Sequence, residues 1–301
     1  MRRSPCWLRP ILLAALLAPF AAQATDADEA AIRAAVADYF QANDRNDPAL
    51  LYRAFQPSLV MYSVDAHGAL AALELNRWAR RLVQAKKPEP ARKREIVHLE
   101  RYGDGASVES LSVFGSHQFR DFLTLLKVGG RWRIVGKVYA SQPVGTPATD
   151  TPDGEAPVRE LIAQQFRSMD RYDGRLLARL YDPRALSLSV REGELVAVPM
   201  GEWAARFDEA AARGDSPGPV RRRIVRVAVC GDVAWARFEH TSPGYHVVDV
   251  ALFARVHGRW RAVHLDYVAM PDQPSRSTTV WPAGGAVIQW SASRKANSAI
   301  R

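Results

Sequence analysis

Apolar positions along the first 140 residues change from a helical period to a period of two. They recur every three to four residues at first, which is typical of amphipathic helices, and alternate further on, which is typical of strands. Pro48 suits the first turn of a helix, and Pro57 ends that helix because the residue before a proline avoids the α region. The pattern predicts helices over Ala30–Asn43, from Asp47-Pro48 to Pro57 and over Leu70–Gln84, and a strand over Leu59–Val64.

Four longer strands follow these helices. They are predicted over Arg94–Tyr102, Ala106–Phe114, Gln118–Val128 and Arg131–Tyr139, and Gly129-Gly130 forms the hairpin turn before the last of them. Three helices followed by a meander predict an α+β fold, in which the helices cover the apolar face of a curved antiparallel sheet. Such a bent layer encloses a cone, and we expect the mouth of the cone to be a pocket.

The same pattern occurs twice in the chain. Ile32–Phe40 aligns with Val158–Phe166 at a separation of 126 residues, and Trp132 aligns with Trp260 at a separation of 128. So small a drift requires only short loop insertions, which indicates a tandem duplication. We therefore predict two domains of the same fold, over residues 25–140 and 156–274.

Two segments lack the apolar periodicity of the repeats. Residues 141–155 are rich in Pro, Gly, Thr and Asp, which predicts a linker that buries no core. Residues 275–301 contain Trp281 and Trp290 among Pro, Gly and Ser. We expect a disordered tail there, and a short strand docked on a sheet edge is the alternative.

The first 24 residues are typical of a secretion signal. Arg2, Arg3 and Arg9 precede an apolar run, and Ala22-Gln23-Ala24 forms a small-x-small cleavage site. The uncharged stretch is shorter than the roughly 20 residues that span a bilayer, and Pro19 interrupts it. We predict a signal peptide over residues 1–24 and a periplasmic or secreted mature protein without a stable membrane span.

Charge and cysteine content further narrow the classes of protein to which the chain can belong. Of the formal net charge of +9, residues 1–24 carry +3 and residues 275–301 carry +4, so the folded repeats are only mildly basic and nucleic-acid binding is not expected. Removal of the signal removes Cys6 and leaves Cys230 as the single cysteine, which excludes an intramolecular disulfide. Stability must therefore come from burial.

A family resemblance rests on two segments of the first repeat. Phe55-Gln56-Pro57 follows two helices, and Phe119–Lys127 leads into Gly130–Tyr139. In these features the chain resembles the family called "Putative lumazine-binding", within the nuclear-transport-factor-2-like superfamily that also contains ketosteroid isomerases and SnoaL-like cyclases. The second repeat matches more loosely, through Asp249, Gly258-Arg259-Trp260 and Tyr267, and departs at Leu265, where the first has Lys137. The resemblance implies tandem cones with a pocket between sheet and helices, and pairing through the sheet faces.

The second repeat contains the candidate catalytic pair, His264 and Asp266. Side chains alternate along a strand, so we expect Trp260, Ala262, His264 and Asp266 to share one face, with the pair about 7 Å apart. An imidazole exchanges protons near neutral pH. The pair is therefore a candidate for proton transfer, and a polar pair at the rim or facing solvent is the alternative. The first repeat has Gly136 and Val138 at the equivalent positions.

Other side chains are candidates for lining a pocket. The aromatic candidates are equally consistent with a packed core, and the histidines would have to converge from neighbouring strands. No metal-ligand spacing is present among the seven histidines, so neither a metal nor a cofactor is expected. The candidate pocket residues are Tyr39, Tyr62, Trp78, Phe122, Trp203, His240, Tyr245 and His246.

Three hypotheses about function follow from the sequence. The first is an exported protein that binds a small apolar molecule in one or both of its cones without catalysis. The second is an isomerase- or cyclase-type enzyme in which His264 and Asp266 transfer a proton on an apolar substrate. The third is a scaffold in which the cones pair through their sheet faces, within one chain as a pseudo-dimer or between chains as a homodimer. We favour binding, with the paired cones as its architecture.

Overall fold

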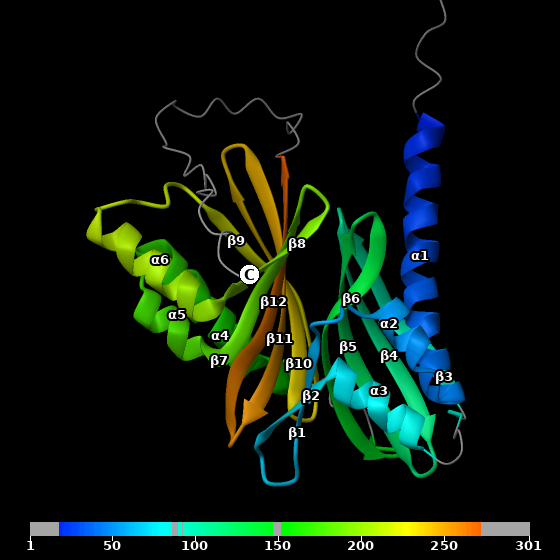
Figure 1. Cartoon of the computed structure of the whole chain (residues 1–301). Coiled ribbons are helices and arrows are strands. Elements are labelled where there is room, and N and C mark those ends of the chain that lie inside the picture. The colour runs from blue at the N-terminus through cyan, green and yellow to red at the C-terminus, as the bar shows by residue number, and fades with distance from the viewer. Residues whose placement is uncertain (1–17, 86–89, 92, 147–151, 272–301) are drawn as a thin grey trace, which may run out of the picture.

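The two repeats fold with the same order of elements (Figure 1). The computed structural model describes residues 18–85, 90–91, 93–146 and 152–271. The first copy consists of α1 (Ala18–Arg45), α2 (Pro48–Ala54), β1 (Val60–Val64), β2 (Leu70–Glu74), α3 (Leu75–Gln84), β3 (Lys93–Tyr102), β4 (Gly105–Phe114), β5 (His117–Val128) and β6 (Arg131–Pro143). The second consists of α4 (Pro152–Arg171), α5 (Gly174–Leu180), β7 (Tyr181–Arg191), β8 (Glu194–Pro199), α6 (Met200–Ala212), β9 (Arg221–Cys230), β10 (Val233–Ser242), β11 (Tyr245–Val256) and β12 (Arg259–Pro271). The predicted tandem α+β fold is confirmed.

Some predicted segments fall partly or wholly outside the described residues. The tail over residues 275–301 and residues 1–17 of the signal lie outside them, and α1 begins within the rest of the signal. Strand β6 extends into the predicted linker to Pro143, and α4 begins at Pro152. None of the described helices is long and apolar enough to cross a membrane.

Each copy forms a six-stranded sheet with the same topology. The strand orders are β2-β1-β6-β5-β4-β3 and β8-β7-β12-β11-β10-β9. The long strands are antiparallel as predicted, but β1 pairs with β6 in parallel, and so does β7 with β12. Gly129 and Gly130 both have positive φ and form the predicted hairpin turn into β6.

The helix predicted over Leu70–Gln84 is correct only from Leu75 onward. Its first five residues form β2, which pairs antiparallel with β1. The cause is the preceding turn, where the Asp65 carboxylate accepts hydrogen bonds from the backbone N–H groups of His67 and Ala69 at 2.9 Å. Gly68, at φ +75°, completes the reversal of the chain.

The molecule has four layers, with helices outside and the two sheets inside (Figure 1). Helices α1 to α3 cover the outer face of the first sheet and α4 to α6 that of the second, each over its own apolar core. A third apolar cluster lies between the sheets. It contains Tyr62, Tyr102, Phe122 and Val138 from the first copy, and Trp235, Val248, Val250, Leu252 and Val263 from the second. The second face of each sheet is thus buried by the other copy.

Two backbone hydrogen bonds join hairpin turns across this seam. The amide of His257 donates to the carbonyl of Gly68, and the amide of Gly129 donates to the carbonyl of Gly193, both at 2.7 Å. Gly68 and Gly193 occupy equivalent positions of the repeats, and so do Gly129 and His257. The first contact thus has its donor in the second copy, and the second contact has its donor at the equivalent position of the first copy.

We expect Gly136→Ala to destabilise the seam. A Cβ at this position of β6 would lie 2.4 Å from Thr124 Oγ1 in the same sheet and 2.5 Å from His264 Nε2 of the other sheet, so these side chains would have to move. Overpacking of this kind costs about 1–3 kcal/mol in the free energy of unfolding. Urea denaturation measures the change, and Gly201→Ala on α6, where nothing lies within 4 Å, is the matched control. Equal stability of the two variants would contradict the close approach of the sheets.

Candidate functional site

The interior of the first cone is filled by its own side chains. The Lys137 ammonium pairs with the Asp121 carboxylate, and the Tyr39 hydroxyl donates to Asp121 Oδ2 at 2.7 Å. Tyr39, Phe55 and Trp78 pack edge to face with ring centroids 5.4–5.7 Å apart. Burial raises the pKa of Tyr39, and Asp121 raises it further. Burial lowers the pKa of Lys137, although Asp121 opposes this. Tyr39 and Trp78 are therefore core residues of the cone.

The second cone is also packed, around a different set of polar contacts. Asp249, which is equivalent to Asp121, accepts from His240 Nδ1 at 3.0 Å, and the Tyr181 hydroxyl donates to Gln165 at 2.8 Å. Phe166 and Phe238 pack edge to face at 5.6 Å. Leu265 occupies the position of Lys137 and belongs to the apolar core.

The remaining candidate pocket residues of the second copy do not converge on His264. Trp203 packs against Phe207 and Tyr267. The Nδ1 atom of His246 lies 3.1 Å from Thr241 Oγ1, and Tyr245 is 46 % exposed at the β10–β11 turn. These side chains, like that of His240, are distributed over the sheet and α6 rather than gathered in one pocket.

The expectation that Trp260, Ala262, His264 and Asp266 share a face is wrong. Leu252 pairs with His264 and Phe253 with Ala262, so Val263 is the extra residue of a β-bulge in β12. The bulge turns Ala262 towards the helices and His264 towards the other copy. The first copy has the same register shift at Val135, which separates Ile134 from Gly136.

His264 and Asp266 therefore meet at the seam. Nε2 of His264 lies 2.8 Å from Asp266 Oδ1 and 3.3 Å from Thr124 Oγ1 of the first copy. Asp266 is fully buried, and its Oδ2 has no hydrogen-bond partner among the described residues. Burial and the nearby Asp266 carboxylate raise the pKa of Tyr102. A hydrogen bond from Nε2 to an ionised Asp266 places a ring proton on Nε2, because such a carboxylate can only accept.

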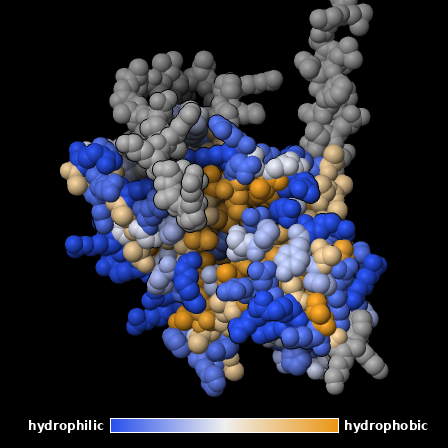
Figure 2. All heavy atoms as spheres, in the orientation of Figure 1, coloured by the Kyte–Doolittle hydropathy of each residue, from blue (hydrophilic) through white to orange (hydrophobic). Residues whose placement is uncertain are grey.

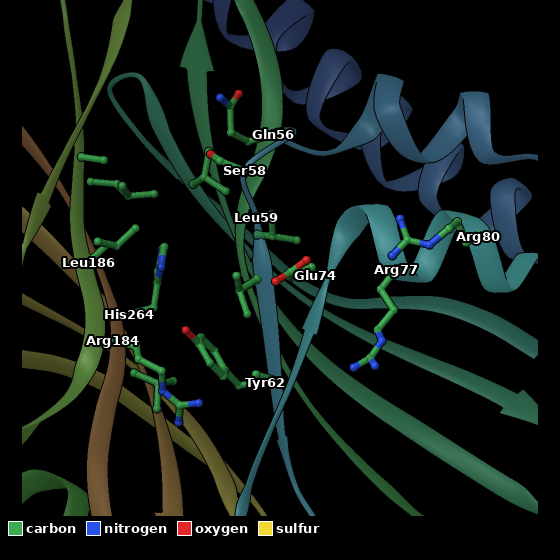
Figure 3. Close-up of a pocket in the computed structure, with 16 residues that line it drawn as sticks. Gln56, Ser58, Leu59, Tyr62, Glu74, Arg77, Arg80, Arg184, Leu186 and His264 are labelled. Carbon is green, nitrogen blue, oxygen red and sulfur yellow. The ribbon is translucent and has the colours of Figure 1, made fainter.

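A cavity of about 670 Å³ opens beside this pair, between the two copies (Figure 3). Apolar residues gather in the hollow between the two halves of the molecule (Figure 2). Tyr62 and His264 point into the cavity, and Arg184 lies beside Tyr62 (Figure 3). Residues of both copies line it, namely Gln56, Ser58, Leu59, Val60, Tyr62, Ala72, Glu74, Arg77, Arg80 and Val135 from the first and Arg184, Leu186, Leu188, Ala197, Val263 and His264 from the second.

Equivalent positions of the two copies meet across this cavity. The strand registers pair Tyr62 with Ala72 in one copy and Leu188 with Ala197 in the other, and all four residues line the cavity. The polar lining arises where the copies differ. The equivalent pairs of unlike residues are Tyr62 and Leu188, Ser58 and Arg184, and Gly136 and His264.

The electrostatics of the wall depend on Arg184. Its guanidinium lies 2.9 Å from the Asp182 carboxylate and 5.9 Å from the centroid of the Tyr62 ring. Burial acts to raise the pKa of Asp182, but the hydrogen bonds from Arg184 lower it below the ordinary value. Burial raises the pKa of Tyr62, so its hydroxyl is a neutral donor at the wall. The described residues contain no group of three or more side chains suited to a metal ion.

Comparison with a family model decides the identity of the repeats. The model described as "Putative lumazine-binding" matches residues 27–140 and 153–267, which together exceed half of the chain. The chain belongs to this family. As a member of the lumazine-binding-like family, it carries two copies of the family domain in tandem.

Solved structures similar to this family member each cover one domain. An NTF-2 like protein of unknown function from Silicibacter pomeroyi DSS-3 is 25 % identical and covers 39 % of this chain and 97 % of its own, with a TM-score of 0.35. One from Shewanella baltica OS155 is 25 % identical over 38 % and 94 %, with a TM-score of 0.36. A ketosteroid isomerase-like protein from Erwinia carotovora atroseptica is 11 % identical over 40 % and 98 %, with a TM-score of 0.32. The search of curated proteins gave no match.

Sequence reasoning identified two of the residues that line the cavity of this lumazine-binding-like protein, Tyr62 and His264. Phe122 packs instead in the apolar cluster between the sheets. Arg77 and Arg80 of α3 and Arg184 of β7 were missed, because only the pairing of the copies brings these two elements to one cavity. A signal for a second buried face is present in β11, where Val247–Phe253 is apolar at all positions except Asp249.

We expect Lys137→Met to destabilise the first domain. The change removes the cation that pairs with Asp121 and leaves a carboxylate buried without it, which costs about 3–5 kcal/mol. Chemical denaturation measures the loss. The double variant Lys137→Met/Asp121→Asn should recover part of it, because the amide carries no charge. A single variant as stable as the wild type would show that the cone interior is open to water.

Proposed function

We propose that this protein is an exported small-molecule-binding protein whose ligand occupies the cavity between its two domains. The observation that carries the proposal is the cavity itself, about 670 Å³, lined by about as many polar as apolar side chains from both copies. Sites for small organic molecules have this size. The two cone interiors support the proposal indirectly. Aromatic side chains and buried ion pairs occupy them, which leaves the cavity between the domains as the place for a ligand.

The scaffold hypothesis becomes part of this proposal. The two copies pair as a pseudo-dimer within one chain. The two backbone hydrogen bonds between hairpin turns of different copies and the apolar cluster between the sheets support this pairing. The cavity requires the pairing, because β1, β2 and α3 of one copy and β7, β8 and β12 of the other supply its walls. Binding and pairing are thus two aspects of one architecture.

Export to the periplasm or beyond is the third part of the proposal. The charged and apolar pattern of residues 1–24 supports it. Cleavage after Ala24 would retain Asp28, whose carboxylate anchors α1 to the sheet. It accepts from Lys127 at 2.8 Å and from Trp132 at 3.0 Å. The match to the family model begins at residue 27, so cleavage would leave the first domain whole.

Native mass spectrometry of the protein isolated from its producing cells tests binding and export together. We expect a chain that begins at Thr25 and carries a co-purified small molecule. Ala197→Trp should weaken binding of that molecule, because an indole at this exposed cavity position takes up part of the binding volume. Ala205→Trp, an equally exposed alanine on α6 outside the cavity, should retain it. A ligand kept by both variants would contradict the cavity as the binding site.

A second candidate function is proton transfer on the bound ligand. The observation that favours it is the 2.8 Å contact between the buried Asp266 and His264, which lines the cavity. A hydrogen bond from Nε2 to an ionised Asp266 would hold a proton on Nε2 and leave Nδ1 to act as a base. In such a step Nδ1 takes a proton from the carbon next to a carbonyl group, and the electron pair moves to the carbonyl oxygen.

His264→Gln should abolish this activity without abolishing binding. In deuterated water, proton NMR would follow exchange at the carbon next to the carbonyl group of a cyclic ketone held in the cavity. We expect exchange with the wild type, and only the uncatalysed rate with His264→Gln. Asp266→Asn should also slow the exchange, because it no longer fixes the ring proton. Exchange that continues in His264→Gln while the ketone still binds would eliminate this candidate.

A further inference from the structure

The charged residues that line the cavity are mostly cationic. Arg77, Arg80 and Arg184 line it, with Glu74 as the acidic counterpart. Arg184 is neutralised by Asp182 at 2.9 Å. Neither Arg77 nor Arg80 has an ion pair within the described part of the chain, and both are exposed at the rim. With Glu74 counted against them, one positive charge remains in excess.

The cationic rim is confined to one copy of the repeat. Helix α3 contains Arg77, Arg80 and Arg81 and no acidic residue. In α6 of the second copy, the position of Arg77 is held by Glu202, which forms an ion pair with Arg206 four residues later. The equivalent of Arg80 is Ala205. Helix α6 neutralises its arginine internally, whereas α3 presents two arginines to the cavity.

The cavity changes character from its rim to its depth. The deep walls are apolar, with Val135 at 3 % exposure, Leu188 at 5 % and Val263 at 1 %. Tyr62 and His264, each 7 % exposed, are the polar groups there. An apolar body can bury its surface at this depth, while a charged group cannot leave water without a partner. The rim arginines supply that partner at the opposite end.

We infer that the ligand is an apolar molecule with one negatively charged group, held by Arg77 and Arg80 at the rim while its body lies between the sheets. This inference rests on the proposed function and adds the chemical class of the ligand. Guanidinium groups donate paired hydrogen bonds to carboxylate, sulfonate and phosphate oxygens, which gives both affinity and orientation. The Tyr62 hydroxyl and the His264 ring then face the inner end of the bound molecule.

Two fluorescent probes with the same aromatic body test the inference. 1-Anilinonaphthalene-8-sulfonate carries one negative charge, and N-phenyl-1-naphthylamine is uncharged. The full-length folded protein should bind the sulfonate more tightly, and added salt should weaken the preference because the rim is exposed. Arg77→Gln/Arg80→Gln should weaken sulfonate binding about 3- to 10-fold, as expected for two exposed charge contacts, and change binding of the neutral probe less than about 2-fold. Arg81→Gln, on the same helix but outside the cavity, is the matched control and should change neither.

Ala197→Trp distinguishes failure of this inference from failure of the proposed function. If Ala197→Trp displaces both probes and the double arginine variant changes neither, the cavity binds ligands but the anionic class is wrong. An equal loss of sulfonate binding in Arg81→Gln would also overturn the anionic class, because it would show a general effect of helix charge. If Ala197→Trp displaces neither probe, the cavity is not the binding site and both proposals fail.

Discussion

The structure depends on one constraint. Each sheet has two apolar faces, and its own helices cover only one of them. Val250 and Leu252 of β11 point away from the helices and are fully buried against the first copy. A fully buried side chain of this kind contributes about 1.5–3 kcal/mol, whereas a hydrogen bond across the seam contributes about 1 kcal/mol net. The apolar cluster therefore holds the copies together. Polar contacts such as those between hairpin turns determine how the two faces are aligned.

The β-bulge in β12 decides what this arrangement can do chemically. Without Val263 as an extra residue, strict alternation would place His264 on the same face as Ala262, inside the second cone. That interior is packed by Phe238 and Phe253 and has no room for an exchangeable ligand. The bulge instead brings the imidazole to the seam, beside Thr124 and next to the cavity. One inserted residue thus moves the candidate base from a filled core to an open wall.

The sequence predicted the tandem α+β fold but not every strand of it, and it predicted only part of the site. Periodicity located the helices and the long strands, and the paired positions of Trp132 and Trp260 revealed the duplication. Periodicity failed to predict the strand at Leu70–Glu74, because the turn formed by Asp65 and Gly68, not the local pattern, makes that segment a strand. The cavity could not be predicted in the same way. Arg77 and Arg184 are far apart in the chain, and only the docking of two sheets makes them neighbours of one space.

The duplication explains why the cavity is asymmetric. In a dimer of identical chains every polar group at the seam would occur twice, and a histidine at both equivalent positions would have to share one place. A Cβ at Gly136 would already lie 2.5 Å from His264 Nε2, so the glycine of the first copy makes room for the imidazole of the second. Arg77 and Arg80 of α3 likewise have no arginine at the equivalent positions of α6, where Glu202 and Ala205 stand. Covalent fusion let the two copies differ, so that Arg77 and Arg80 at the rim come from one copy and the imidazole of the inner wall comes from the other.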